Sequence, residues 1–270
     1  YMNIFVCAKQ VPDTNEIKID PVTNTLIRKG VPSILNTYDA FALEQALRIK
    51  DKDPEVKITV ISMGPPQADP MLRDCLAVGA DNAYLVTDRK FGGSDTLATS
   101  YILSEAIKKV AETEGEPDMV FCGLQAIDGD TAQVGPELAE HLDLPQITYG
   151  YTAEVNEEGL KVLKEVEGGA LEIQMTLPAL VTFTKYGDLE LRYPKIKNKL
   201  KAKKATINQI TFEELKESID ETAIGLKGSP TRVNKSYTPT VEKVGEIFED
   251  MEAGDAADKL IAALADKKLI

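Results

Sequence analysis

The sequence has 270 residues, of which 43% are hydrophobic, so it can bury a substantial core in one large domain or in a domain with extensions. A formal net charge of −13 argues against a surface that binds nucleic acid or anionic membrane. No apolar run approaches the roughly 18 residues of a transmembrane helix, and MNIFVCAK lacks the apolar segment of a signal peptide. We therefore expect a cytoplasmic globular protein without membrane insertion.

Strands and helices alternate along the first half of the chain. Short apolar runs predict strands, and apolar residues at helical spacing predict helices. The expected strands are 3–8, 57–62, 83–87 and 119–122, and the expected helices are 39–50, 70–78 and one that reaches about residue 111. Asp69 and Pro70 are predicted as N-cap and first residue of the second helix, which Gly79 closes. Ser94 or Asp95 is expected to cap the third helix.

After Pro145 the pattern changes to strands joined by short turns. The strand-like runs are 146–155, 160–166, 171–175 and 179–184, with turn candidates at 156–159 and 167–169. The fold class we predict is α/β, with a mostly parallel, doubly wound sheet, helices on both faces, an antiparallel extension and a C-terminal arm. One nucleotide-binding domain is expected over 1–227, and 228–270 would hold a linker to about 239 and an amphipathic helix at about 255–267.

The three cysteines lie far apart in the sequence, inside apolar patterns. Cys7, Cys75 and Cys122 therefore predict buried thiols. Because there is no C-x-x-C motif and only one histidine, His141, we expect no metal site of the zinc or iron–sulfur kind. Any electron chemistry must then belong to a bound cofactor.

The segment from Met119 to Leu142, MVFCGLQAIDGDTAQVGPELAEHL, reads as a buried strand, a loop of small residues and a helix start. Loops at the carboxyl ends of parallel strands and helix N-termini present unpaired N–H groups, which bind nucleotides. The loop has no Lys or Arg and no G-x-x-x-x-G-K-[ST] pattern, so an ATP-hydrolysing phosphate loop is not expected. An ordinary strand-to-helix loop, in which the aspartates cap turns, remains the alternative at this point.

The basic stretch RYPKIKNKLKAKK, from Arg192 to Lys204, stands out in an acidic protein. Such a cluster is often a solvated loop. The interleaved Ile196 and Leu200 favour instead a surface that binds a partner, because exposed apolar residues ringed by charge often mark such surfaces.

Several segments, in order and spacing, resemble the beta subunit of electron-transfer flavoproteins over essentially the whole chain. They are VCAKQVPDT (6–14), LNTYDAFALEQALRIK (35–50), VISMGPPQA (60–68), LAVGAD (76–81), GLQAIDGDTAQVGP (123–136), LPAL (177–180) and KAKK (201–204). The resemblance implies an adenine-nucleotide alpha-hydrolase-like fold. It also implies a heterodimer with an alpha subunit that carries an FAD, while the beta subunit itself holds a nucleotide.

The resemblance also implies which residues touch that nucleotide. They are Cys7, Ala8, Lys9, Asn36, Tyr38, Asp39, Met63, Gly64, Thr96, Thr99, Gly123, Leu124, Gln125, Ala126, Ile127, Asp128, Gly129, Asp130, Thr131, Ala132, Gln133 and Val134. The 192–204 segment matches the family's partner-recognition loop, with Ile196, Leu200, Lys201 and Lys204 as partner-binding residues. Ile196 stands where the family often has Leu. The resemblance names no catalytic acid or base.

Two branches of the family differ in the occupant of this site. One branch holds a structural AMP, and the other, which bifurcates electrons, holds a second FAD. Pro12, Asp13, Thr14 and FGGSDTLAT with Thr96 and Thr99 resemble the bifurcating branch. A diphosphate needs donors beyond those that serve one phosphate, and a helix N-terminus with two hydroxyls supplies them.

The function that the resemblance implies is therefore electron bifurcation. NADH is the donor, and ferredoxin or flavodoxin is the low-potential acceptor. The second route runs through the FAD of the alpha subunit to an acyl-CoA dehydrogenase of the butyryl-CoA type. Two other readings stay open: a non-redox protein that senses AMP or ATP, as stress proteins of the same strand order do, and a structural partner with AMP whose alpha subunit carries the single FAD.

Overall fold

The computed structural model describes residues 2–13, 32–234, 245, 247 and 249–270, and the chain divides into two units, 1–234 and 235–270. Thr14, which contributes to the family resemblance, and residues 235–239 of the predicted linker lie outside the described residues.

A sheet of nine strands organises the first unit, in the order β11-β5-β4-β1-β6-β10-β7-β8-β9. From β11 to β7 every neighbouring pair is parallel, and β7, β8 and β9 are antiparallel. The strands are β1 Asn3–Cys7, β4 Lys57–Met63, β5 Asn82–Val86, β6 Met119–Gly123, β7 Gln146–Asn156, β8 Gly159–Val166, β9 Gly169–Met175, β10 Ala179–Phe183 and β11 Asn208–Ile210. The predicted mostly parallel sheet with an antiparallel extension is confirmed.

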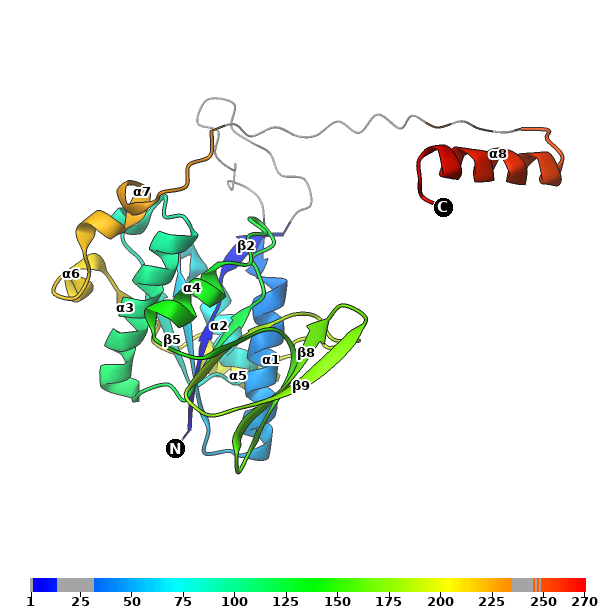
Figure 1. Cartoon of the computed structure of the whole chain (residues 1–270). Helices are drawn as coiled ribbons and strands as arrows, with labels where there is room; N and C mark the ends of the chain where they lie inside the picture. Colours follow the sequence, from blue (N-terminus) through cyan, green and yellow to red (C-terminus); the bar gives the residue numbers. More distant parts are fainter. Residues whose placement is uncertain (1, 14–31, 235–244, 246, 248) are drawn as a thin grey trace. The chain divides into compact units, whose positions relative to one another are not determined.

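Helices cover both faces of the parallel strands (Figure 1). The long helices are α1 Thr37–Lys52, α2 Asp69–Val78, α3 Thr96–Glu114 and α4 Val134–His141. Ile4 and Val6 of β1 belong to the core beneath α1 and α2, whereas Phe5 and Cys7 belong to the core beneath α3 and α4. Because both faces are buried, the central strands are apolar at most positions, which is why short apolar runs predicted them.

The remaining elements are short. They are β2 Gln10–Pro12, β3 Ser33–Leu35, η1 Pro66–Ala68, η2 Arg89–Phe91, α5 Ile196–Ala202, α6 Phe212–Leu215, η3 Glu221–Ala223 and α7 Gly225–Gly228. β2 and β3 form a separate antiparallel pair. In the second unit, α8 Ala253–Asp266 has no buried residues, and Leu260 and Ile261 are more than half exposed.

β1 marks the point where the strand order reverses. The chain passes from β1 to β4 on one side, and β6 then returns to the other side of β1. In doubly wound sheets the loops at such a point separate and leave a crevice outside the carboxyl ends of the strands. The fold therefore places a crevice beside the ends of β1 and β6.

Two sequence-based expectations need correction. α2 begins at Asp69 and has Ala68 as its N-cap. The Asp69 carboxylate does not cap the helix N-terminus, because it pairs with Arg73, one turn further along, at 2.6 Å. The basic segment is not a plain loop, since it contains α5. The first compact unit runs to Asn234, and within it the buried Ser229 hydroxyl accepts the Asp95 amide (2.8 Å).

Replacement of Gly135 by Ala tests the contact that places α4. A Cβ at Gly135 would overlap the Cγ2 methyl of Thr182 in β10, so the free energy of unfolding should fall by about 1–3 kcal/mol. Thr182→Ser removes this methyl but keeps the hydroxyl that accepts the Tyr149 amide. In denaturant unfolding, the double variant should lose less than the sum of the two single variants. Strict additivity would contradict this packing.

Candidate functional site

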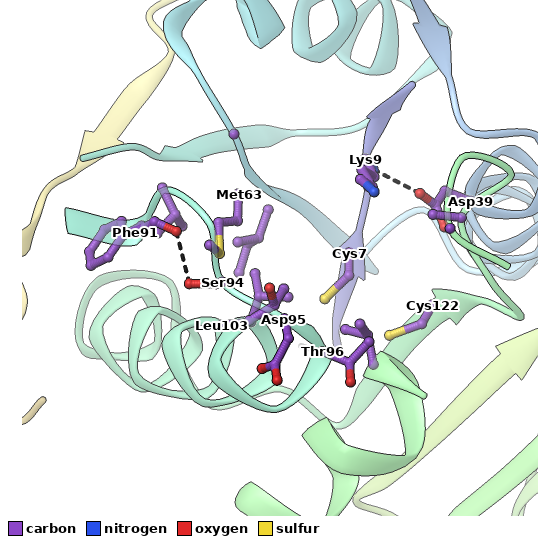
Figure 2. A pocket seen from close by; sticks show the side chains of 18 of the residues that line it. Cys7, Lys9, Asp39, Met63, Phe91, Ser94, Asp95, Thr96, Leu103 and Cys122 are labelled. Carbon is purple, nitrogen blue, oxygen red and sulfur yellow. Dashed lines mark hydrogen bonds between the residues drawn. The ribbon is translucent and has the colours of Figure 1, made fainter. Parts of the chain in front are cut away.

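A cavity of about 1020 Å³ lies at the carboxyl ends of five neighbouring strands, β11, β5, β4, β1 and β6. Its lining includes Gln209 and Thr211 at one end and Gly123 at the other, with Cys7 and Met63 between them. This volume is at the upper end of the range typical of small-molecule sites. Figure 2 shows side chains from the ends of β1, β4 and β6 and from the start of α3 converging on it.

Asp39, in the first turn of α1, connects the carboxyl end of β1 with that of β6, the neighbouring strands at which the strand order reverses. Its carboxylate accepts the backbone amide of Lys9 at 2.7 Å and that of Gly123 at 3.1 Å. A Cβ at Gly123 would overlap this carboxylate, so only glycine permits the approach. Burial raises the pKa of Asp39 to about 7, although the amides of Lys9 and Gly123 and the Asn36 side chain act to lower it.

The loop from Leu124 to Gln133 is held from behind by two side chains. Asn36, fully buried, donates to the Gln125 carbonyl (2.8 Å) and accepts the Ile127 amide (3.1 Å). Lys9 forms an ion pair with Asp128 at 2.7 Å. The loop backbone also turns through left-handed conformations at Asp130 and Ala132, with φ of 51° and 54°. Its shape is therefore fixed by the Asn36 hydrogen bonds and by the Lys9–Asp128 ion pair.

The N-termini of α3 and α4 meet at the side of the cavity. Asp95 caps α3, as one of the two sequence alternatives predicted, and accepts the Ala98 amide at 3.1 Å. Burial opposes its ionisation, but the amides of Ala98 and Thr231 leave the pKa of Asp95 below its usual value. The Thr96 hydroxyl lies 3.2 Å from Glu137 and 3.3 Å from Gln133. Burial raises the pKa of Glu137.

Cys7 and Cys122 stand side by side on the floor of the cavity, as the labelled sulfur atoms in Figure 2 show. The β1–β6 register pairs Val6 with Phe121, so the next residue of each strand is a cysteine on the same face. Two effects raise the pKa of Cys122 well above its usual value: the larger is its hydrogen bond with the Cys7 thiol, and the second is burial. All three cysteines are buried and free, which confirms the prediction of buried thiols.

Most of the residues that the sequence pointed to as nucleotide contacts are brought together in this cavity. Those that line it are Cys7, Ala8, Lys9, Asp39, Met63, Gly64, Thr96, Thr99, Gly123, Leu124, Gln125, Ala126, Gly129, Asp130, Thr131, Ala132, Gln133 and Val134. Asn36, Tyr38, Ile127 and Asp128 do not line it. Asn36 and Asp128 support the loop, and Tyr38 packs edge-on against Phe41.

The sequence did not name every residue of the lining as a contact. The lining residues that it left unnamed are Ile61, Pro65, Pro66, Val86, Thr87, Asp88, Arg89, Phe91, Gly92, Gly93, Ser94, Asp95, Leu103, Cys122, Gly135, Gln209 and Thr211. Phe91 to Asp95 belong to the FGGSDTLAT motif, and Cys122 and Gly135 to the 119–142 segment, both of which the sequence singled out. β11, which carries Gln209, has only three residues and no periodicity to detect. The available signal was the capping box formed by Thr211 and Glu214, which predicts the start of a short helix there.

Ile196, Leu200 and Lys201 lie on α5 and Lys204 lies in the turn that follows it, and none of them lines the cavity. Ile196 is 80% exposed and Leu200 is 58% exposed, and Lys201 and Lys204 are exposed too. The helix is anchored by Arg73 of α2, which donates to the carbonyls of Ala202 (3.0 Å), Lys203 (3.1 Å) and Ala205 (2.8 Å). The exposed apolar side chains therefore stand on a fixed support.

Two further findings concern metals and membranes. Within the described ranges, no group of three or more His, Cys, Asp or Glu side chains is arranged to hold a metal ion. Among the helices of the same ranges, none is both long and apolar enough to cross a membrane.

Comparison with known proteins gives consistent matches over the full length. Residues 23–215 match the family described as "Electron transfer flavoprotein domain". The chain is 48% identical to "Electron transfer flavoprotein subunit beta" of Megasphaera elsdenii and 49% identical to the protein of the same name from Thermoanaerobacterium thermosaccharolyticum, with 100% of each chain covered. It is 45% identical to "Caffeyl-CoA reductase-Etf complex subunit CarD" of Acetobacterium woodii, again over 100% of both chains.

The pKa of Asp39 predicts how stability changes with pH. Between about pH 4 and pH 7 the folded protein keeps a proton on Asp39 that the unfolded chain has released, so this group lowers the free energy of unfolding as pH rises. Asp39→Asn removes the effect. Relative to the variant, the free energy of unfolding of the unmodified protein should fall by up to about 4 kcal/mol between about pH 4 and pH 7, because each pKa unit corresponds to about 1.4 kcal/mol. Urea unfolding at several pH values measures it, and a constant difference would contradict the shift.

Proposed function

This chain belongs to the electron transfer flavoprotein family as a beta subunit, and from that premise we propose that it holds an FAD in the cavity at the strand ends and takes electrons from NADH. Beta subunits of this family pair with an alpha subunit. In the proposed function, electrons leave this FAD by two routes, one of which leads to ferredoxin or flavodoxin. The other leads through the FAD of the alpha subunit to an acyl-CoA dehydrogenase, for which butyryl-CoA dehydrogenase is the candidate.

The breadth of the cavity is the observation that carries this proposal. Its lining draws on five adjacent strands, and with about 4.8 Å between neighbours their ends span about 19 Å. Dinucleotides bind across such crevices, next to the point where strand order reverses. A mononucleotide held by the 124–133 loop would leave the β5 and β11 side of the cavity without a ligand. The dimensions therefore favour FAD over AMP.

The donors in the cavity also suit a diphosphate. The N-termini of α3 and α4 present unpaired amides, and Thr96 and Thr99 add hydroxyls beside them. The Thr96 hydroxyl, which lies beside Glu137 and Gln133, can turn toward a phosphate oxygen. Helix N-termini attract anions without adding net charge to an acidic protein.

A bound flavin would supply redox chemistry that the side chains lack. The part of the chain is to bind and orient it. Asp39 fixes the backbone of Lys9 and Gly123, and Asn36 fixes the loop that follows β6. Met63, Phe91 and Leu103 give the cavity an apolar wall, which limits the access of water.

The name of one relative supports the choice of final acceptor. That relative is named as a subunit of a caffeyl-CoA reductase–Etf complex, which joins an electron transfer flavoprotein to an enzyme that acts on an acyl-CoA. An acyl-CoA dehydrogenase is a partner of the same chemical class. For this chain we assign its contact to the exposed residues of α5.

The occupant of the cavity can be determined from the co-expressed heterodimer. After denaturation, chromatography should give two FAD per heterodimer and no AMP. One FAD with one AMP would support the housekeeping role instead. AMP in a colourless protein would support nucleotide sensing, and either of these results would contradict the proposal.

The role of α3 is tested by Thr96→Ala combined with Thr99→Ala. Loss of two hydroxyl donors to charged oxygens should weaken retention of the FAD of this subunit on the order of 10–100-fold and leave the alpha-subunit FAD in place. Thr113→Ala, which alters an exposed residue at the opposite end of the same helix, is the matched control and should retain both flavins. Equal loss of both flavins, or no loss, would count against the phosphate role.

The role of α5 is tested by Ile196→Ser. Since this side chain is largely exposed, the variant should fold and keep its flavin, yet reduce the acyl-CoA dehydrogenase with a rate lowered about 10-fold or more. Leu171→Ser, which alters an exposed aliphatic residue of β9, is the control and should leave the rate unchanged. The rate is measured with purified dehydrogenase, and an unchanged rate for Ile196→Ser would argue against this surface.

A further inference from the structure

Acidic residues outnumber basic residues in the lining of the cavity. Four are acidic, and two, Lys9 and Arg89, are basic. The acidic ones are Asp39, Asp88, Asp95 and Asp130. A ligand with a pyrophosphate would add further negative charge, so the state of each basic side chain decides how well such a ligand is held.

Internal contacts already occupy the acidic side chains and one of the two cations. Asp39 and Asp95 accept backbone amides, and Asp130 accepts the side-chain amide of Gln125 at 2.8 Å. Lys9 pairs with Asp128. Arg89 is exposed, and within the described ranges no hydrogen bond or ion pair of its guanidinium occurs. One cation of the lining therefore remains available to a ligand.

The turn that carries Arg89 is held rigidly by its neighbours. Asp88 accepts the Lys90 amide (2.9 Å) with one carboxylate oxygen and the Phe212 amide (3.1 Å) with the other. The Lys90 ammonium lies 3.5 Å from the centre of the Phe212 ring and pairs with Glu221.

The other side of the turn is closed as well. Phe91 is buried, and its carbonyl accepts the Ser94 hydroxyl at 2.8 Å, as the dashed line in Figure 2 marks. A Cβ at Gly225 of α7 would overlap the Lys90 carbonyl, so the backbone of α7 lies directly against the turn. Arg89 is thus the side chain of the turn for which the described part of the chain offers no hydrogen bond or ion pair, and the backbone that carries it is held in place.

We propose that the Arg89 guanidinium pairs with the pyrophosphate of a dinucleotide bound in this cavity, and so acts as its anion anchor at the β5 side. The inference rests on the proposed function, because it takes the ligand to be a dinucleotide. The pyrophosphate belongs either to FAD or to NADH, which share this chemistry. A guanidinium suits the role, since it can donate two parallel hydrogen bonds to phosphate oxygens and stays charged at every physiological pH.

The test compares the intact heterodimer with the variants Arg89→Gln and Arg89→Lys, and with Arg48→Gln as control. Arg48 is an exposed arginine of α1 outside the cavity lining. Two constants are measured at about 0.05 M and about 0.5 M salt: the FAD concentration for half-reconstitution of this subunit, and the KM for NADH, with kcat recorded alongside. Higher ionic strength screens charge pairs, so it separates a charged contact from a structural effect.

Arg89→Gln should raise one of the two constants about 10-fold or more at low salt, which corresponds to about 1.4 kcal/mol, and should reduce its salt dependence. Arg89→Lys should recover part of the loss, because it keeps the charge but not the planar fork. A change in FAD affinity assigns the contact to FAD, and a change in KM alone assigns it to NADH. The Arg48→Gln control should match the unmodified protein.

Two results would overturn the inference, and they are distinct. If the unmodified heterodimer holds flavin in this subunit but both constants are unchanged in Arg89→Gln, the Arg89 assignment is wrong and the proposed function stands. If the unmodified heterodimer holds AMP there instead, the proposed function fails, and the dinucleotide partner of Arg89 fails with it.

Discussion

The site depends on the contact between the Asp39 carboxylate and the backbone amides of Lys9 and Gly123. In a doubly wound sheet the loops part where the strand order reverses, so nothing in the sheet itself fixes how the ends of β1 and β6 lie relative to α1. Asp39 provides that constraint from the first turn of the helix. The same contact requires glycine at 123, since any side chain there would displace the carboxylate. One buried acid therefore sets the geometry of two loops that the sequence separates widely.

The two halves of the cavity are held by different means. On the β6 side the loop is fixed by polar contacts from behind, through Asn36 and the Lys9–Asp128 pair. On the β5 side the turn is fixed by Asp88 and by packing against α6 and α7. Both arrangements leave backbone amides and a few side chains facing inward, while the supporting groups are satisfied elsewhere. A rigid lining of this kind lowers the entropic cost of holding a long, flexible ligand.

The sequence predicted the parts of the fold that local patterns determine. The strands ending at Cys7, Met63 and Gly123 are buried on both faces, so their apolar runs are distinct, and the cap at Asp95 follows from local hydrogen bonding. It did not predict β2, β3 and β11, whose three residues each are too few to show a period. Nor did it locate Arg89 in the cavity, because the turn at residue 89 meets the other lining residues only through the order of the strands. Local chemistry can be read from a sequence, but long-range juxtaposition requires the topology.

The charge of the cavity explains why its anion-binding capacity is built mainly from neutral donors. The protein is strongly acidic, and four aspartates line the cavity, so a cluster of lysines and arginines there would be neutralised by ion pairs, as Lys9 already is by Asp128. Helix N-termini and loop amides cannot be neutralised in this way, because their dipoles are fixed by the backbone. Most of the lining can therefore receive phosphates through amides and hydroxyls. Of the two cations in the lining, Arg89 is the one that the acids of the described part of the chain do not engage, so in the proposed complex its guanidinium would set where along the cavity a pyrophosphate lies.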